Sequence, residues 1–134
     1  MQYILASHGQ YAVETKNSCQ MITGVNEAIH AVAFTETMGV KDVTSQYEKI
    51  INEYLNDEIT IIVDILGGTP CNAAILVSEK YQNIKIVSGL SLALVIPLSL
   101  GESLDAAMAG IKETTKLLIT EKAIHQNDNG EEED

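Results

Sequence analysis

The 134-residue sequence contains no arginine and no tryptophan, a single phenylalanine, two prolines and two cysteines. Its eight basic residues are all lysines, and they stand against 19 acidic residues, which gives a formal net charge of −11. This balance argues against binding to nucleic acid or to an anionic membrane surface. Any phosphate group that the chain handles has to be held by backbone N–H groups, hydroxyls or lysine, or by an arginine that a partner supplies.

Long hydrophobic runs are missing as well. The longest, residues 90–100, is interrupted by serine and proline, and none approaches the roughly 18–20 residues that a membrane span needs. No basic segment precedes the first apolar residues, so we predict a first strand there and no signal peptide. Cys19 and Cys71 fall in different predicted helices, and without a secretion signal we expect free thiols in a reducing compartment. These features predict a cytoplasmic protein without metal or cofactor sites.

Apolar segments of strand length alternate with helical patterns along the chain. We predict strands at residues 2–7, 29–34, 59–63 and 84–87, and a fifth at 117–120. Helices are predicted at residues 11–22, with Ala12, Cys19 and Ile22 on one side, after Gly39, at 69–80 and, as a long helix, from Ser103. After Gly39, the period of a helix that packs on a sheet is followed by Val43, Tyr47, Ile50, Ile51 and Tyr54. Residues 92–100 form an apolar, poorly amphipathic segment. Four successive βα units indicate a doubly wound, flavodoxin-like α/β sandwich, mostly parallel, with helices on both faces.

The chain is short enough to form one domain, which we place at residues 1–122. Residues 123–134 are predicted to be a tail, because 126–134 hold five acidic residues and no lysine. Such a composition is typical of a disordered, solvated segment.

Two residues with chemical potential lie at the predicted ends of neighbouring parallel strands. His8 ends the first apolar run, and Asp64 ends the run at 59–63. Ligands of open α/β sheets collect in the crevice outside the carboxyl ends of the strands. A carboxylate that accepts a hydrogen bond from Nδ1–H fixes the imidazole tautomer and leaves Nε2 free to attack. The pair therefore predicts a directed histidine nucleophile, with Ser7 and Gly9 beside it as groups suited to a small anion.

The turn that follows Asp64 is suited to binding an anion. Gly67 and Gly68 allow a sharp turn and a close approach of backbone N–H groups to a ligand. Thr69 and Pro70 are predicted to be the N-cap and first residue of a helix, whose free N–H groups and dipole favour negative charge. Thr69 adds a hydroxyl to the same place.

The remaining reactive side chains have weaker signals. His30 lies at the start of a strand, on the edge opposite the crevice, and His125 precedes the acidic tail, so we interpret both as bystanders. Cys71 lies near a helix start, where a thiol can have a lowered pKa, but no base is near it in the sequence. We expect it to be a structural residue.

The sequence resembles a known family at three places. Ser-His-Gly after the first strand, Asp-Ile-Leu-Gly-Gly-Thr-Pro-Cys-Asn-Ala-Ala after the third and Ser-Gly-Leu-Ser-Leu after the fourth are similar to the IIA domain of the mannose-type sugar phosphotransferase system. The resemblance extends to about residue 122. It implies a parallel sheet covered by helices and a homodimer that exchanges an antiparallel C-terminal strand.

The resemblance also implies roles for individual residues. His8 would be transiently phosphorylated on nitrogen, Asp64 would orient it, and Thr69 would lie near the phosphoryl group. The donor would be the histidine phosphocarrier protein and the acceptor the IIB component, with the membrane components IIC and IID involved indirectly. A rim that contacts these partners would include Leu66, Pro70, Asn72 and Ser91.

Two departures from the family pattern fall on this rim. Leu66 stands where the family often has an aromatic residue, and residues 89–93 replace a common Gly-Val-Asn-Leu-Pro sequence. Both concern partner contacts and loop geometry rather than the histidine chemistry.

Alternative functions remain open at this point. The phosphocarrier subunit of a phosphotransferase-dependent dihydroxyacetone kinase is similar in fold and in its histidine. A receiver domain phosphorylated on aspartate shares the architecture, but it needs an acidic cluster where this chain has Ser-His-Gly. A flavin-binding module would need aromatic walls that this composition does not provide.

Overall fold

A single parallel sheet forms the centre of the molecule in a computed structural model that describes residues 1–119. Its four strands are β1 (Gln2–His8), β2 (Ile29–Phe34), β3 (Ile59–Val63) and β4 (Ile84–Ser88). They lie in the order β2-β1-β3-β4, and every neighbouring pair is parallel. Four of the five predicted strands are thus confirmed, with β1 and β4 each one residue longer.

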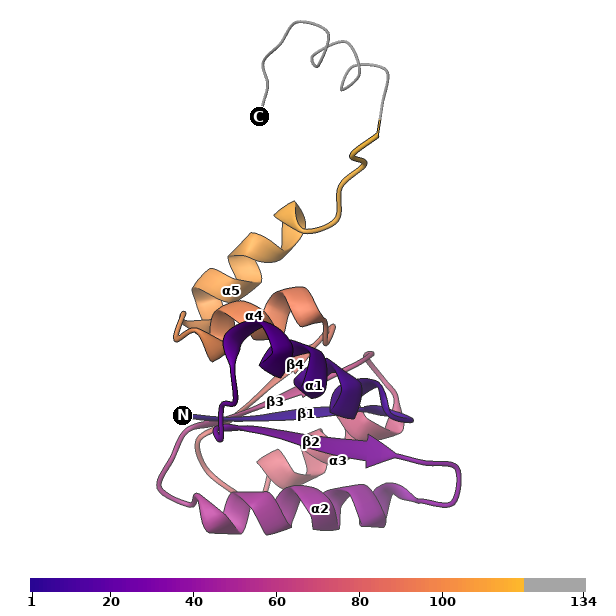
Figure 1. Ribbon diagram of the computed structural model, residues 1–134. Helices are drawn as coiled ribbons and strands as arrows, with labels where there is room; N and C mark the ends of the chain where they lie inside the picture. The colour runs from indigo at the N-terminus through magenta and orange to yellow at the C-terminus, as the bar shows by residue number, and fades with distance from the viewer. Residues whose placement is uncertain (120–134) are drawn as a thin grey trace, which may run out of the picture.

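Helices cover both faces of the sheet, as Figure 1 shows. On one face lie α1 (Tyr11–Thr23), α4 (Leu92–Ser99) and α5 (Leu104–Gly110), with a 3-10 turn at Ile111–Glu113. On the other lie α2 (Val40–Glu53) and α3 (Thr69–Ser78). This arrangement confirms the doubly wound, flavodoxin-like α/β fold. Within residues 1–119, no helix is both long enough and apolar enough to cross a lipid bilayer.

The burial of β3 explains its position inside the sheet. All five of its residues are buried, and successive side chains alternate between the two faces. Ile61 and Val63 join the core beneath α2 and α3, whereas Ile62 joins the core beneath α1 and α4. Each such side chain contributes about 1.5–3 kcal/mol when it leaves water. A strand that is apolar on both faces is stable only between two helical layers.

The helix after Gly39 packs as its periodicity predicts. Val43, Tyr47 and Ile51 are buried at spacings of four residues and face the sheet. Its start is held by Asp42, whose carboxylate accepts a hydrogen bond from the Gly39 N–H at 2.7 Å. A carboxylate in the first turn also interacts favourably with the helix dipole.

Two details of the sequence-based prediction are wrong, and the structure assigns a helix to a segment for which the sequence predicted only an apolar character. Ile22, expected to share a buried face with Ala12 and Cys19, is exposed at the end of α1, where Thr15 is buried instead. Residues 92–100 are mostly helical and form α4. The sequence shows no helical period here because a helix that is buried nearly all round has apolar residues on every side. The long last helix is a seven-residue α5 that gives way to the 3-10 turn after Gly110, a poor helix former.

The predicted fifth strand falls partly on described residues. Leu117, Leu118 and Ile119 are exposed and have no regular secondary structure in this single chain. Thr120 and the acidic tail lie outside the described residues. Within residues 1–119, β2 and β4 are the two edges of the sheet.

Candidate functional site

The two predicted catalytic residues meet at the centre of the sheet. β1 has β2 on one side and β3 on the other, so the direction of winding reverses around it. His8 is the last residue of β1, and Asp64 follows β3 directly, where its N–H donates to the Ala6 carbonyl at 3.1 Å. Both residues therefore lie at the carboxyl edge of the sheet, at the switch point where α/β folds bind ligands.

Asp64 holds both the ring and the main chain of His8. Its Oδ2 lies 2.7 Å from His8 Nδ1 and accepts a hydrogen bond from the His8 backbone N–H at 2.9 Å. A carboxylate can only accept, so Nδ1 carries the hydrogen and Nε2 of the neutral ring carries the lone pair. The His8 side chain is 46% exposed and that of Asp64 14%. The geometry supplies a fixed imidazole with an accessible nucleophilic nitrogen.

The environment of Asp64 favours its charged form. Burial alone would raise the pKa of this carboxyl. The hydrogen bonds from the backbone and ring of His8, together with one from the Ile65 N–H to Oδ1 at 2.9 Å, outweigh burial and hold the pKa below its usual value. Asp64 is thus a carboxylate at neutral pH and can balance positive charge on the imidazole.

The imidazole lies against Gly68, at the start of α3. A Cβ placed on Gly68 would come within 2.8 Å of His8 Cε1 and 3.4 Å of Nε2, so a side chain here would displace the ring. Gly67 has φ +78°, a conformation that favours glycine. Together these glycines bring the backbone beside Nε2. The first-turn N–H groups of α3 lack acceptors within the helix, and such groups favour the binding of an anion.

Residues behind the turn fix its position. The N–H of Asn72 donates to the Gly68 carbonyl at 2.9 Å, and its side-chain amide donates to the Gly67 carbonyl at 3.3 Å. The hydroxyl of Tyr47, on α2, donates to the Pro70 carbonyl at 2.8 Å, and burial raises the pKa of this phenol well above its usual value. The periodicity of the helix after Gly39 indicates only that Tyr47 is a core residue. Its hydroxyl in a buried helix face was the signal for a polar partner.

Other predicted site residues lie elsewhere or play another part. Ser7 is fully buried, and its Oγ accepts a hydrogen bond from the Ala12 N–H at 2.6 Å, which ties β1 to α1. The N-cap of α3 is Gly68 rather than Thr69, which is the first helical residue. Thr69 is half-buried beside the turn, and Gly9, with φ +58°, turns the chain after His8.

The four predicted rim residues differ in their accessibility. Leu66 is 78% exposed, and Asn72 is also exposed although its amide supports the turn. Pro70 is buried and offers no surface to a partner. Ser91 is half-buried, and its hydroxyl caps α4 by accepting from the Leu94 N–H at 3.1 Å.

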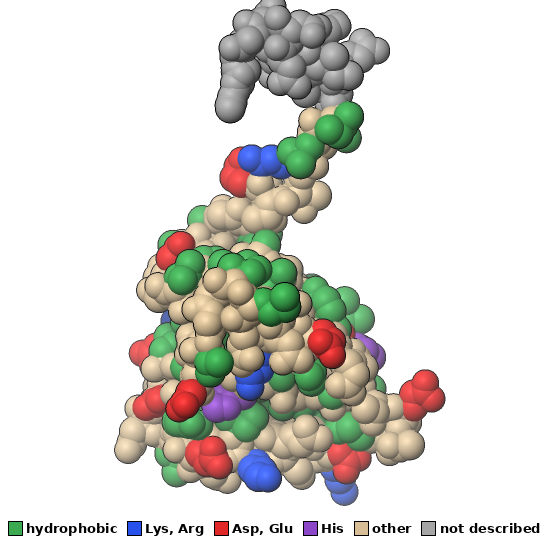
Figure 2. Space-filling model, viewed as in Figure 1, with side chains coloured by type: hydrophobic (Ala, Val, Ile, Leu, Met, Phe, Trp, Pro, Cys, Tyr) green, Lys and Arg blue, Asp and Glu red, His purple; other side chains and the backbone are tan. Residues whose placement is uncertain are grey.

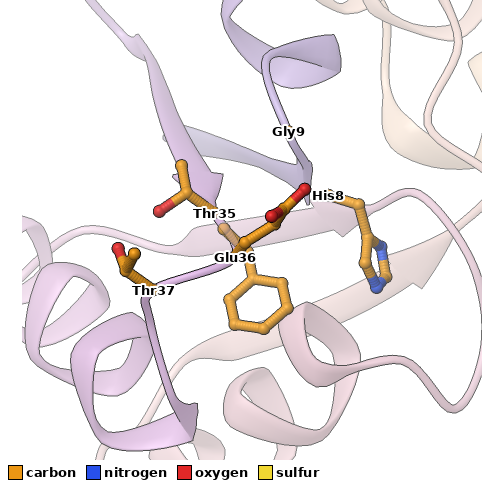
Figure 3. Close-up of a pocket in the computed structure, with 6 residues that line it drawn as sticks. His8, Gly9, Thr35, Glu36 and Thr37 are labelled. Carbon is orange, nitrogen blue, oxygen red and sulfur yellow. The ribbon is translucent and has the colours of Figure 1, made fainter.

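An open pocket of about 610 Å³ lies beside His8, on the side of β2. Figure 3 shows it, lined by His8, Gly9, Phe34, Thr35, Glu36 and Thr37. The rings of His8 and Phe34 meet edge to face, with centroids 5.5 Å apart. No motif in the sequence pointed to residues 34–37 as part of the site.

The comparisons with known proteins agree with one another. A family model described as "PTS system fructose IIA component" matches residues 2–116. The chain is 35% identical to the sorbose-specific EIIA component of Klebsiella pneumoniae over 96 residues, which cover 71% of this chain and 70% of that protein. It is 31% identical to the fructose-specific EIIA component of Bacillus subtilis (strain 168) over 103 residues, or 75% and 70% of the two chains.

Solved structures show the same likeness. The mannose/sorbose specific IIA subunit of the phosphotransferase system from Enterococcus faecalis superposes with a TM-score of 0.79 at 30% identity, covering 89% of this chain and 96% of that one. Fold and comparisons together define a phosphotransferase component of sugar transport. The chain belongs to the EIIA family of the mannose-type sugar phosphotransferase system.

Proposed function

We propose that His8 is the phosphoryl carrier of this protein. It takes a phosphoryl group from the histidine phosphocarrier protein and passes it to the IIB component, so that sugar uptake through the membrane components can proceed. The observation that carries this proposal is the 2.7 Å contact between His8 Nδ1 and Asp64, with Nε2 beside the start of α3.

The transfer step follows from this geometry. The lone pair of His8 Nε2 forms a bond to phosphorus, while the P–N bond to the histidine of the donor breaks and its electron pair returns to that imidazole. Asp64 stabilises the imidazolium that develops on His8. N–H groups around Gly68 and the Thr69 hydroxyl are placed to receive the phosphoryl oxygens. Transfer to IIB is the same step in reverse, with a group of IIB as the nucleophile.

The test is to locate the phosphoryl group. With phosphoenolpyruvate, the general enzyme of the system and the phosphocarrier protein, we expect one label per chain on His8. A phosphoramidate is labile in acid and persists in alkali, whereas an acyl phosphate does not survive alkali. His8→Ala should abolish the label, and the control variants His30→Gln and His125→Ala should retain it. A label that survives His8→Ala, or is lost in mild alkali, would contradict the proposal and point to Asp64.

We also propose that the active protein is a homodimer in which residues 117–120 of one chain extend the sheet of the other. Support comes from the exposed apolar side chains of Leu117, Leu118 and Ile119, which a symmetric exchange would cover twice. Truncation after His125 should leave a dimer, whereas truncation after Thr115 should yield monomers or aggregates. Light scattering that finds a monomer for the full chain at micromolar concentration would refute the exchange.

A further inference from the structure

The open pocket beside His8 lies on the β2 side of β1. His8 pairs with Phe34 across β1 and β2, and the Gly9 N–H donates to the Phe34 carbonyl at 2.7 Å. Asp64 and Gly68 lie on the other side of β1, next to β3. The nucleophile is therefore flanked by an orienting carboxylate on one side and by this open pocket on the other.

The pocket contains a carboxylate that nothing else in the site explains. Glu36 is exposed and, among residues 1–119, it has no ion-pair or hydrogen-bond partner. In Figure 3 its side chain extends in the direction of His8 and Gly9, while the Thr35 and Thr37 hydroxyls lie to the other side. The turn beneath it is held by the Met38 N–H, which donates to the Thr35 carbonyl at 3.0 Å.

A carboxylate at this place is unfavourable for a phosphorylated His8 unless a cation lies between them. The phosphoryl group is negatively charged, and Glu36 lines the same pocket as His8, so the two negative charges repel each other. This chain has no arginine, and no lysine lines the pocket. Among residues 1–119, then, no basic side chain lies in the pocket to offset both groups, and a docked partner can supply one.

We infer that Glu36 and the pocket receive a basic side chain of the histidine phosphocarrier protein when that protein transfers its phosphoryl group to His8. The Glu36 carboxylate pairs with the ammonium or guanidinium group, and the Phe34 ring offers an aromatic contact to the same cation. The remaining N–H groups of this cation face the phosphoryl oxygens. A side chain suits the pocket better than a divalent metal ion, because a single carboxylate lines it and hard cations take six or more oxygen ligands. This inference rests on the proposed role of His8.

The experiment measures the second-order rate of phosphoryl transfer from the phosphorylated phosphocarrier protein to the full chain. Glu36→Gln should lower this rate about 3- to 10-fold at low ionic strength and flatten its salt dependence between about 0.05 and 0.5 M. Glu36→Lys should lower it further. The matched control is Glu27→Gln, which removes the same charge from an exposed position before β2, at the opposite end of the sheet, and should stay within about twofold of the wild type.

A small donor separates docking from chemistry. Phosphoramidate needs no protein contact, so Glu36→Gln should react with it at least as fast as the wild type, because a repelling charge has gone. A basic residue of the phosphocarrier whose neutralisation slows the wild type but not Glu36→Gln would identify the partner group.

Two outcomes would overturn the inference, and they are distinguishable from failure of the proposed function. If the wild type is labelled on His8 and Glu36→Gln accepts from the phosphocarrier as fast as Glu27→Gln or faster, Glu36 does not bind a partner cation. If Glu36→Gln slows the reaction with phosphoramidate as much as it slows transfer from the phosphocarrier, the substitution acts on the histidine and not on docking. A wild type that takes no label on His8 would remove the proposed function itself, and this inference with it.

Discussion

Replacement of Asp64 by asparagine tests the central geometry, because the two oxygens of the carboxylate have different partners. Oδ2 accepts from the ring and backbone of His8, and Oδ1 accepts from the Ile65 N–H. An amide has only one acceptor oxygen. If the oxygen faces His8, the NH₂ group meets the Ile65 N–H. If the NH₂ group faces His8, the ring has to turn Nδ1 into an acceptor, which moves the proton to Nε2 and blocks the nucleophile.

Either orientation also removes the negative charge that balances the imidazolium. Loss of one preorganised electrostatic group typically costs a factor of about 10² to 10³ in rate. We therefore expect phosphoryl transfer to Asp64→Asn to fall by ~10²-fold or more, equivalent to about 2.7 kcal/mol in the barrier. The free energy of unfolding should fall by only about 1–2 kcal/mol, because the pair is partly exposed and some hydrogen bonds persist.

The pH dependence of stability provides a second measurement on the same variant. Because the folded-state pKa of Asp64 lies below its usual value, the stabilising contribution is complete above about pH 4. It is lost as the pH falls through the lower, folded-state value. Urea unfolding of wild type and Asp64→Asn should thus differ at neutral pH and converge in acid. Wild-type transfer rates in a folded Asp64→Asn protein would show that the carboxylate serves only the backbone at the strand ends.

Gly68→Ala should keep its fold, since φ is −80°, but should slow phosphoryl transfer ~10²-fold in rapid-quench measurements, because the new Cβ displaces the His8 ring. The control is Gly110→Ala, where a new Cβ would meet no atom within 4 Å. Tyr47→Phe removes a second hydrogen bond from the Pro70 carbonyl, which still accepts from Ala74 within α3, so urea unfolding should show a loss of about 0.5–1.5 kcal/mol in the free energy of unfolding, and an unchanged midpoint would contradict the contact. Burial, with Lys16 adding to it, lowers the pKa of His30, so the unfolded chain binds a proton first and the free energy of unfolding should fall as pH drops below about 6.5. His30→Gln should remove that slope in denaturation at successive pH values, and an identical slope would refute the assignment.

The sheet was predictable because the strands carry a simple signal. β3 and β2 are short apolar runs bounded by polar residues and turns, and their predicted bounds match the structure. His8 and Asp64 could be paired for the same reason, since the carboxyl ends of neighbouring parallel strands must meet at one edge of the sheet.

Other features depend on information that a linear pattern does not hold. Thr69 is a better N-cap by composition than Gly68, but the close approach of the imidazole selects glycine at that position. The Ser7 hydroxyl accepts from the Ala12 N–H, which lies in the first turn of α1 and has no acceptor within that helix. Glu36 belongs to a connection whose residues have no motif, and only the pairing of β1 with β2 brings it beside the site.

The partial exposure of the single nucleophile has a kinetic consequence. Nε2 is the one ring atom available for bond formation, because Nδ1 is occupied by Asp64. If His8 carries the phosphoryl group as proposed, the donor and the acceptor protein approach the same atom from the same open side, and both cannot occupy His8 of one chain at once. On the proposed function, turnover follows a ping-pong scheme in which the chain alternates between two partners. Unphosphorylated phosphocarrier, present in excess, competes with IIB for the loaded histidine and slows sugar uptake without any separate regulatory site.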